Sequence, residues 1–142
     1  MKKEWRFIIV GKPILKYRHA NQFKGELILS DRAHIHKNVE IELSGNVIIK
    51  DYAEIANYTM IFTHKHHWNH SRDLRKDIQT IEPVDLIIES DVFIGVRCIL
   101  YGVERIGKGA VIGAGSMLTK NVPDFEIWAG NPAKKIGERR DE

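Results

Sequence analysis

Residues 88–123 read IESDVF IGVRCI LYGVER IGKGAV IGAGSM LTKNVP, six consecutive blocks of six residues that each begin with isoleucine or leucine. A strand has a side-chain period of two and an α-helix a period of 3.6, so an apolar period of six fits neither a helix nor a hairpin meander. The pattern indicates a coil of short, flat strands. This stretch therefore predicts a solenoid.

The same spacing occurs twice earlier in the chain, at Leu29, Ile35 and Ile41 and again at Ile49, Ile55 and Ile61. Small or modest residues follow four places after nearly all of these positions; Glu104 is the exception, which we interpret as a bulge in the wall. Three blocks make one triangular turn, so about four turns would stack three aliphatic columns as parallel sheets. The predicted columns are 29/49/88/106, 35/55/94/112 and 41/61/100/118.

Three motifs make the pattern more specific: VFIG at residues 92–95, IGAGS followed by LTKNVP at 112–123, and AGNPAK at 129–134. With the spacing, they resemble the hexapeptide-repeat acyltransferases, in the branch of maltose, galactoside and polysaccharide O-acetyltransferases. The likeness covers roughly residues 29–137. It implies an all-β fold, a left-handed parallel β-helix, which is an exception to the right-handed crossover rule.

The length predicts a single domain over residues 1–142. Residues 1–28 would form an N-terminal lead-in that caps the coil or makes an irregular first turn. Residues 64–87 would form a protruding active-site loop, and residues 123–142 a C-terminal cap for which a short helix is one option.

Composition excludes several classes of function. The net charge is +3, and the basic clusters are interleaved with acids, so a nucleic-acid-binding stripe is not expected. Lys12 and Pro13 end the early apolar run too soon for a signal peptide, and no stretch could span a bilayer, which indicates a cytoplasmic protein without a membrane partner. The single cysteine, Cys98, falls at an inward small position and is interpreted as a buried, inert thiol.

The repeat is interrupted between Ile61 and Ile88 by an insertion that opens with THKHHWNH at residues 63–70. Long insertions in a solenoid are usually functional. In the resembling acetyltransferases, a histidine here is the general base and the loop reaches toward the neighbouring subunit of a trimer. The resemblance implies His66, with His64 as the rival if the alignment slips within the block.

Imidazole suits this role because its ordinary pKa of ~6.5 leaves it mostly neutral yet basic enough to accept a hydroxyl proton. Glu82 is a candidate to orient the ring through its other nitrogen. Trp68 offers a flat apolar face on which a sugar could stack, or it packs on the adjacent protomer. The sequence leaves open whether Arg72, Arg75 and Lys76 contact an acidic sugar or an opposing subunit.

The resemblance also implies where acetyl-CoA would bind. The expected contacts are the Ala114 backbone for the pantetheine amides, Thr119 and Lys120 near the nucleotide end, and Lys134 or Lys135 for phosphate. Two residues depart from the pattern: Phe93 stands where relatives usually carry tryptophan, and Val96 where they carry glycine, serine or alanine. Val96 could narrow the channel near the thioester and alter the preferred acyl group.

The first hypothesis for function is an acetyl-CoA-dependent O-acetyltransferase that acts on a hydroxyl of a sugar or polysaccharide precursor, as a homotrimer with sites between protomers. The alternative is an N-acetyltransferase acting on an amino-nucleotide-sugar, which would not need a strong base. A non-catalytic β-helix scaffold is less favoured. So is a zinc site like that of γ-class carbonic anhydrases, with His34, His36 and His70 as ligands; no metal is therefore expected.

Overall fold

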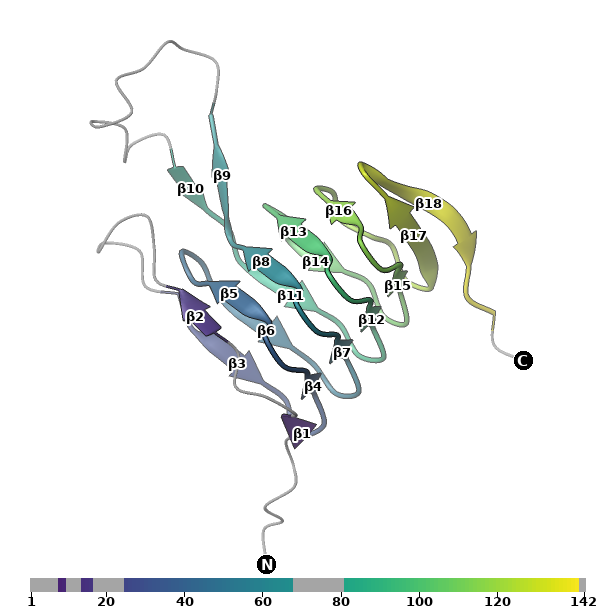
Figure 1. The fold of residues 1–142 in the computed structure, drawn as a ribbon, viewed down its shortest axis with the longest axis horizontal. Coiled ribbons are helices and arrows are strands. Elements are labelled where there is room, and N and C mark those ends of the chain that lie inside the picture. Colours follow the sequence, from purple (N-terminus) through teal and green to yellow (C-terminus); the bar gives the residue numbers. More distant parts are fainter. Residues whose placement is uncertain (1–7, 10–13, 17–24, 68–80, 141–142) are drawn as a thin grey trace, which may run out of the picture.

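The computed structural model describes residues 8–9, 14–16, 25–67 and 81–140. Within these ranges every regular element is a strand, and most of the strands wind into a three-sided solenoid whose sides are three mainly parallel sheets (Figure 1). None of the described residues forms a helix that could cross a membrane.

The first side of the solenoid is a sheet of seven strands, six of them parallel. Ile35, Ile55, Ile94 and Ile112 lie in register along it and point into the core, where all four are fully buried. We call this side sheet A. Its strands, in spatial order, are β1 (Ile8–Ile9), β4 (His34–Ile35), β7 (Glu54–Ile55), β12 (Phe93–Ile94), β15 (Val111–Ile112), β17 (Glu126–Gly130) and β18 (Ala133–Glu138).

The second and third sides, sheet B and sheet C, carry the other two aliphatic columns. Ile41, Ile61, Leu100 and Leu118 are in register in sheet B. Leu29, Ile49, Ile88 and Ile106 are in register in sheet C. Sheet B contains β2 (Ile14–Lys16), β5 (Glu40–Glu42), β8 (Met60–Phe62), β13 (Ile99–Tyr101) and β16 (Met117–Leu118), and sheet C contains β3 (Leu27–Leu29), β6 (Val47–Ile49), β11 (Leu86–Ile88) and β14 (Arg105–Ile106).

All three columns predicted from the sequence are thus confirmed, pair by pair. The physical reason is that each turn alone buries little, whereas stacking identical positions removes a continuous aliphatic core from water. The small residues four places after the block heads are buried beside them, as with Ala53, Cys98 and Ala110. The block that begins at Leu100 is irregular, because Glu104 stands four places after its first residue. There Gly102 turns the chain with a φ of +63°, so that Val103 points into the core and Glu104 is exposed.

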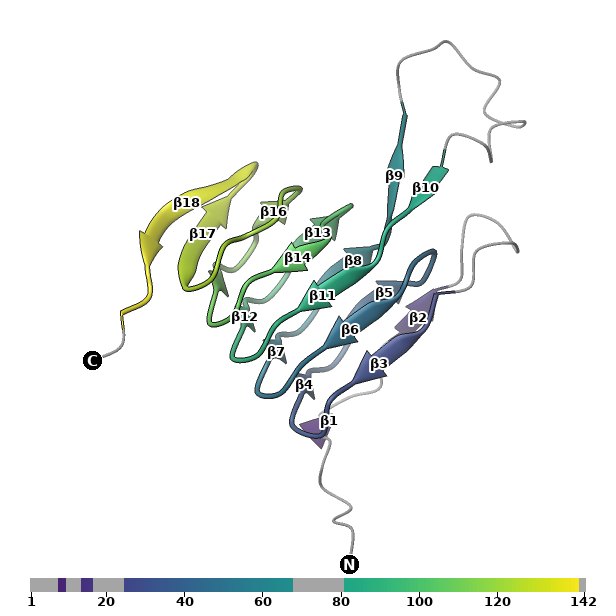
Figure 2. The same ribbon diagram turned by 180° about the vertical axis from the view of Figure 1, so that it is seen from behind.

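The two ends of the solenoid are closed differently. At the N-terminal end, β1 and β2 add a partial turn, with Ile9 opposite Ile35 and Leu15 opposite Ile41. At the other end, β17 continues sheet A and β18 folds back on it as an antiparallel hairpin, seen at the far end of the stack from β1 in Figure 2. A helix in the tail was therefore the wrong option, because the open edge of β15 is completed by a strand.

The predicted loop leaves the solenoid as a two-stranded antiparallel stem. Its strands are β9 (His64–His66) and β10 (Ile81–Pro83), and the stem projects from the body of the stack (Figure 1). The chain rejoins the solenoid where the backbone N–H of Val84 donates to the Thr63 carbonyl at 3.0 Å. The insertion ends at residue 85, slightly earlier than predicted, because β11 begins at Leu86.

Candidate active site

The base of the projecting stem contains a buried histidine held by a buried carboxylate. His64 begins β9, two residues after the end of β8 in sheet B, and its side chain is only 3% exposed. Its Nδ1 lies 3.1 Å from Oε2 of Glu42, which comes from the preceding turn. Ionisable groups this deeply buried are normally paired, and here each is the partner of the other.

Glu42 is surrounded by hydrogen-bond donors. The Thr63 backbone N–H donates to Oε2 at 3.0 Å, and the Ser44 hydroxyl donates to Oε1. Burial raises the pKa of Glu42, but hydrogen bonds from His64, Ser44 and Thr63 outweigh burial and bring the pKa to about 2. Glu42 is therefore ionised at neutral pH.

An ionised Glu42 determines the tautomer of His64. A carboxylate only accepts hydrogen bonds, so in the neutral imidazole Nδ1 carries the proton and Nε2 is the acceptor nitrogen. The adjacent Thr63 fixes the backbone, since its hydroxyl donates to the Glu42 carbonyl at 2.8 Å and accepts from the Gly45 N–H at 2.9 Å. This arrangement prepares Nε2 to accept a proton and stabilises the resulting imidazolium.

Aromatic rings line the rest of this site. The His64 ring makes edge contacts with His66 at 4.9 Å, Tyr101 at 5.4 Å and Phe62 at 6.2 Å between ring centroids. Burial raises the pKa of Tyr101, partly offset by a backbone hydrogen bond from His66. Tyr101 is therefore a neutral phenol near neutral pH, able to donate a hydrogen bond.

The other predicted residues of the loop lie as follows. His66 is half-buried beside His64. Glu82 is on β10 opposite Lys65, and its Oε2 lies 2.9 Å from Nε2 of His67, with both side chains more than half exposed. Trp68, like Arg72, Arg75 and Lys76, falls outside the described residues.

The predicted cofactor residues all lie at exposed positions toward the C-terminal end. Ala114 is at a corner of the solenoid next to Val96, whose carbonyl accepts a bond from the Gly115 N–H at 2.8 Å. A Cβ on Gly95 would come 2.6 Å from the Ala114 backbone nitrogen, so glycine is needed for the two turns to approach at this corner. Val96 is 44% exposed there.

The lysines of this region differ in their surroundings. Thr119 and Lys120 are exposed just after β16, and Lys134 is exposed on β18. Lys135 is held by two carboxylates, with its Nζ 3.1 Å from Glu126 and 2.7 Å from Glu138. The charge of Lys135 is thus already neutralised locally. From the sequence alone, Lys134 and Lys135 were equivalent candidates for binding phosphate.

Glu42 and Tyr101 were missed by sequence reasoning. The signal was present, because the column Ile41, Ile61 and Leu100 implies that the next residues, Glu42, Phe62 and Tyr101, also form a column. What the column could not show is the bend at Thr63 that brings His64 back over Glu42.

The described residues contain no group of three potential metal ligands. His34 and His36 are both in the first full turns, and His36 Nε2 lies 2.7 Å from Glu54. His70, the third ligand of the zinc hypothesis, lies outside the described ranges.

Comparison with known proteins agrees with this fold. The family described as "Hexapeptide repeat of succinyl-transferase" matches residues 85–120. Among solved structures, the hexapeptide-repeat acetyltransferase VCA0836 of Vibrio cholerae superimposes with a TM-score of 0.74 at 22% identity, covering 96% of this chain and 72% of that one. A galactoside acetyltransferase in complex with coenzyme A gives 0.62 at 26% identity, covering 95% and 66%.

The chain therefore has the left-handed parallel β-helix fold of these acetyltransferases, and its residues 85–120 match the hexapeptide repeat. A curated relative, the 2,3,4,5-tetrahydropyridine-2,6-dicarboxylate N-acetyltransferase of Staphylococcus aureus, is 45% identical over 51 residues, which are 36% of this chain. The matched region spans about a fifth of that relative's length, 21%.

Proposed function

We propose that the protein is an acyltransferase that uses acetyl-CoA to acetylate a hydroxyl group of a sugar or polysaccharide precursor. The observation that carries the proposal is the Glu42–His64 pair at the base of the projecting stem. It supplies an imidazole whose Nδ1 is engaged by a carboxylate, on a fold whose structural neighbours include an acetyltransferase complexed with acetyl-CoA. Sugar acceptors are suggested by the galactoside acetyltransferase likeness.

The reaction would proceed by direct transfer. The acceptor hydroxyl gives its proton to the histidine as its oxygen attacks the thioester carbonyl carbon. The tetrahedral intermediate then breaks its carbon–sulfur bond, and the departing thiolate takes the proton from the imidazolium. A positioned base of this kind typically contributes ~10²- to 10⁴-fold in rate. Cys98 takes no part, because direct transfer forms no covalent intermediate on the protein.

Two histidines compete for the role of base. Partial exposure favours His66, the residue that the resemblance implied. The carboxylate partner favours His64, since Glu42 fixes its tautomer and would stabilise its protonated form. We assign the role to His64 and treat His66 as the neighbour that lines the approach to it.

For the cofactor, we propose that the corner at Val96 and Ala114 receives the pantetheine arm and that Thr119, Lys120 and Lys134 lie near the phosphates. Exposure of all five residues supports this assignment. Lys135 is the weaker candidate because two carboxylates already hold it.

We also propose a cytoplasmic homotrimer with sites between protomers. Sheet B supports the homotrimer, because its outward column of Met60, Ile99 and Met117 is apolar and only partly buried within one chain. Burying such a column between copies would remove apolar surface from water.

An N-acetyltransferase is the second candidate, favoured by the similarity to the staphylococcal N-acetyltransferase over 51 residues. A neutral amine is already nucleophilic, so that reaction depends less on a base. Thiol release from acetyl-CoA separates the two candidates if amino sugars and amino-nucleotide-sugars are tested beside hydroxyl acceptors.

The test is thiol release from acetyl-CoA with a sugar panel, using the wild type, His64→Ala and His66→Ala. We expect hydroxyl-dependent release that falls by about 10²-fold or more in His64→Ala and by less than about tenfold in His66→Ala. The reverse order would make His66 the base. No release with any acceptor would overturn the acyltransferase proposal.

A further inference from the structure

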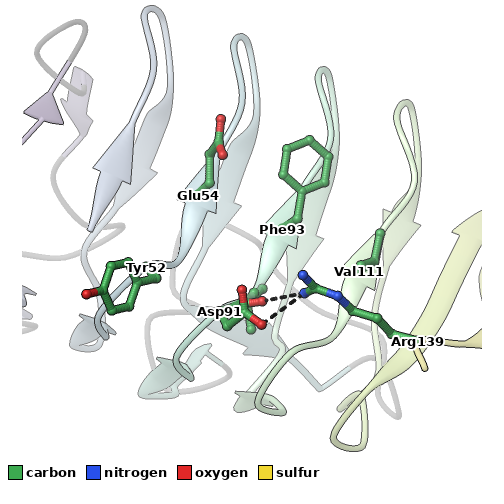
Figure 3. Close-up of a pocket in the computed structure, with 7 residues that line it drawn as sticks. Tyr52, Glu54, Asp91, Phe93, Val111 and Arg139 are labelled. Carbon is green, nitrogen blue, oxygen red and sulfur yellow. Dashed lines mark hydrogen bonds and ion pairs between the residues drawn. The ribbon is translucent and has the colours of Figure 1, made fainter. Parts of the chain in front are cut away.

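Sheet A carries a hollow on its outer face, separate from the Glu42–His64 pair, which joins sheet B to the base of the stem. Its volume is about 330 Å³. The lining residues come from neighbouring turns and from the chain after β18, and they are Tyr52, Glu54, Asp91, Val92, Phe93, Val111 and Arg139 (Figure 3).

The hollow combines apolar surface with hydrogen-bonding groups. Phe93 is 40% exposed, although it occupies a strand position within the sheet, and Val111 lies next to it in register on β15. Tyr52 is 58% exposed at the corner below. Figure 3 shows the side chains of Glu54, Phe93 and Val111 pointing to the same side of the sheet.

The charges in the hollow are already organised by contacts within the protein. Arg139 Nη1 lies 3.2 Å from Asp91 Oδ2 and donates to the Asp91 carbonyl at 3.0 Å (Figure 3). Glu54 Oε1 is 2.7 Å from His36 Nε2, while its side chain remains 40% exposed. Counting two carboxylates and one guanidinium, the lining carries one net negative charge.

These features restrict the chemistry of a ligand. The excess of carboxylate disfavours phosphates and acidic sugars, because like charges repel at this range. Carboxylates with spare lone pairs accept hydrogen bonds from hydroxyl groups, and a flat aromatic ring covers the apolar face of a ring compound. A few polar groups around an apolar floor are typical of small-molecule sites.

We propose that this hollow is a binding subsite for a sugar ring without acidic groups. Phe93 and Val111 would pack against the ring, and Glu54 and Asp91 would accept from its hydroxyls. Arg139 would act as a positioning residue that holds Asp91. The proposal goes beyond the proposed acetyl transfer, because binding here needs neither acetyl-CoA nor His64.

The test is titration of the ¹⁵N-labelled full chain with glucose and maltose, in the absence of acetyl-CoA, followed by amide chemical shifts. We expect the shifts to concentrate at residues 54, 91–93 and 111, with a dissociation constant in the millimolar range, as for an open site. Glucuronate, which adds a carboxylate, should bind more weakly than glucose.

Phe93→Ala should weaken glucose binding by about three- to tenfold, the usual range for a lost aromatic contact. Tyr58→Ala is the matched control, an exposed aromatic at a different corner, and should leave binding unchanged. Glu54→Gln, which keeps the shape of the side chain, should also weaken binding and guards against misfolding of the Phe93 variant. Absence of shifts in the hollow, equal loss in both aromatic variants, or glucuronate binding as tightly as glucose would overturn the proposal.

Discussion

Glu42 and His64 are separated by a full turn of the solenoid, yet their side chains meet at 3.1 Å in a site where both are nearly inaccessible to solvent. The parallel stacking of β5 on β8 brings the two backbones together. The bend at Thr63 then directs His64 over the carboxylate. The pair links the fold to the proposed chemistry, because a solenoid turn places the Glu42 carboxylate and the stem places the His64 imidazole.

The role of Glu42 can be tested by Glu42→Gln, which keeps size but removes the charge. We expect the rate constant kcat to fall by about ten- to a hundredfold, because a neutral amide neither enforces the tautomer nor stabilises the imidazolium. KM for acetyl-CoA should change little. Steady-state kinetics check this, and a change confined to KM would contradict the positioning role.

Glu42 should also make stability depend on pH. Its pKa is lower in the folded chain than the ordinary value of 4.5, so its contribution is complete above about pH 4.5 and is lost as the pH falls toward 2. A pKa lowered to about 2 corresponds to roughly 3 kcal/mol. Urea unfolding at pH 6, 4 and 3 should show the difference between wild type and Glu42→Gln shrinking with acidification; a constant difference would argue against this mechanism.

The two lysines of β18 should differ in their effect on cofactor binding. Lys134→Ala should raise KM for acetyl-CoA several-fold with kcat unchanged, as expected when a contact is equal in ground and transition states. Lys135→Ala should have a smaller effect, because Glu126 and Glu138 already engage that ammonium group. Steady-state kinetics of both variants at fixed ionic strength give the two KM values for acetyl-CoA. Equal increases in KM would contradict the prediction and show that the ion pairs of Lys135 open when acetyl-CoA binds.

Gly95 should be intolerant of a side chain. In Gly95→Ala the new Cβ would lie 2.6 Å from the Ala114 nitrogen, so the turns must separate at the corner that we assign to pantetheine. We expect a loss of about 1 to 3 kcal/mol in unfolding free energy, typical of overpacking. Gly137→Ala is the control, since its Cβ would meet only Ile127 Cδ1 at an ordinary 3.8 Å. Thermal unfolding of the two variants provides the comparison.

Cys98 should be silent in a thiol assay on the native protein. It is the only cysteine, its side chain is fully buried, and burial raises the pKa of its thiol. Reaction with a thiol reagent should therefore be slow in the folded chain and rapid in denaturant, because the thiolate is the reactive form. Fast labelling of native protein would indicate that the corner at Gly113, whose carbonyl accepts from the Cys98 Sγ at 3.2 Å, opens readily.

The sequence alone determined the solenoid and its register. The aliphatic residues of a six-residue period are buried together only when corresponding positions of successive turns stack. Ile94 therefore had to lie between Ile55 and Ile112. The insertion after Thr63 and the buried position of Cys98 followed from the same count. These features depend on local periodicity, which a linear sequence displays directly.

Only the tertiary structure decided which side chains meet outside the core. It paired His64 with Glu42, gave Lys135 two carboxylate partners, and joined Arg139 to Asp91 across a corner. It also made the tail a hairpin rather than a helix, because an open sheet edge was available to pair with it. Such contacts depend on how corners bend and where side chains point, and the spacing of residues along the chain carries no direct record of either.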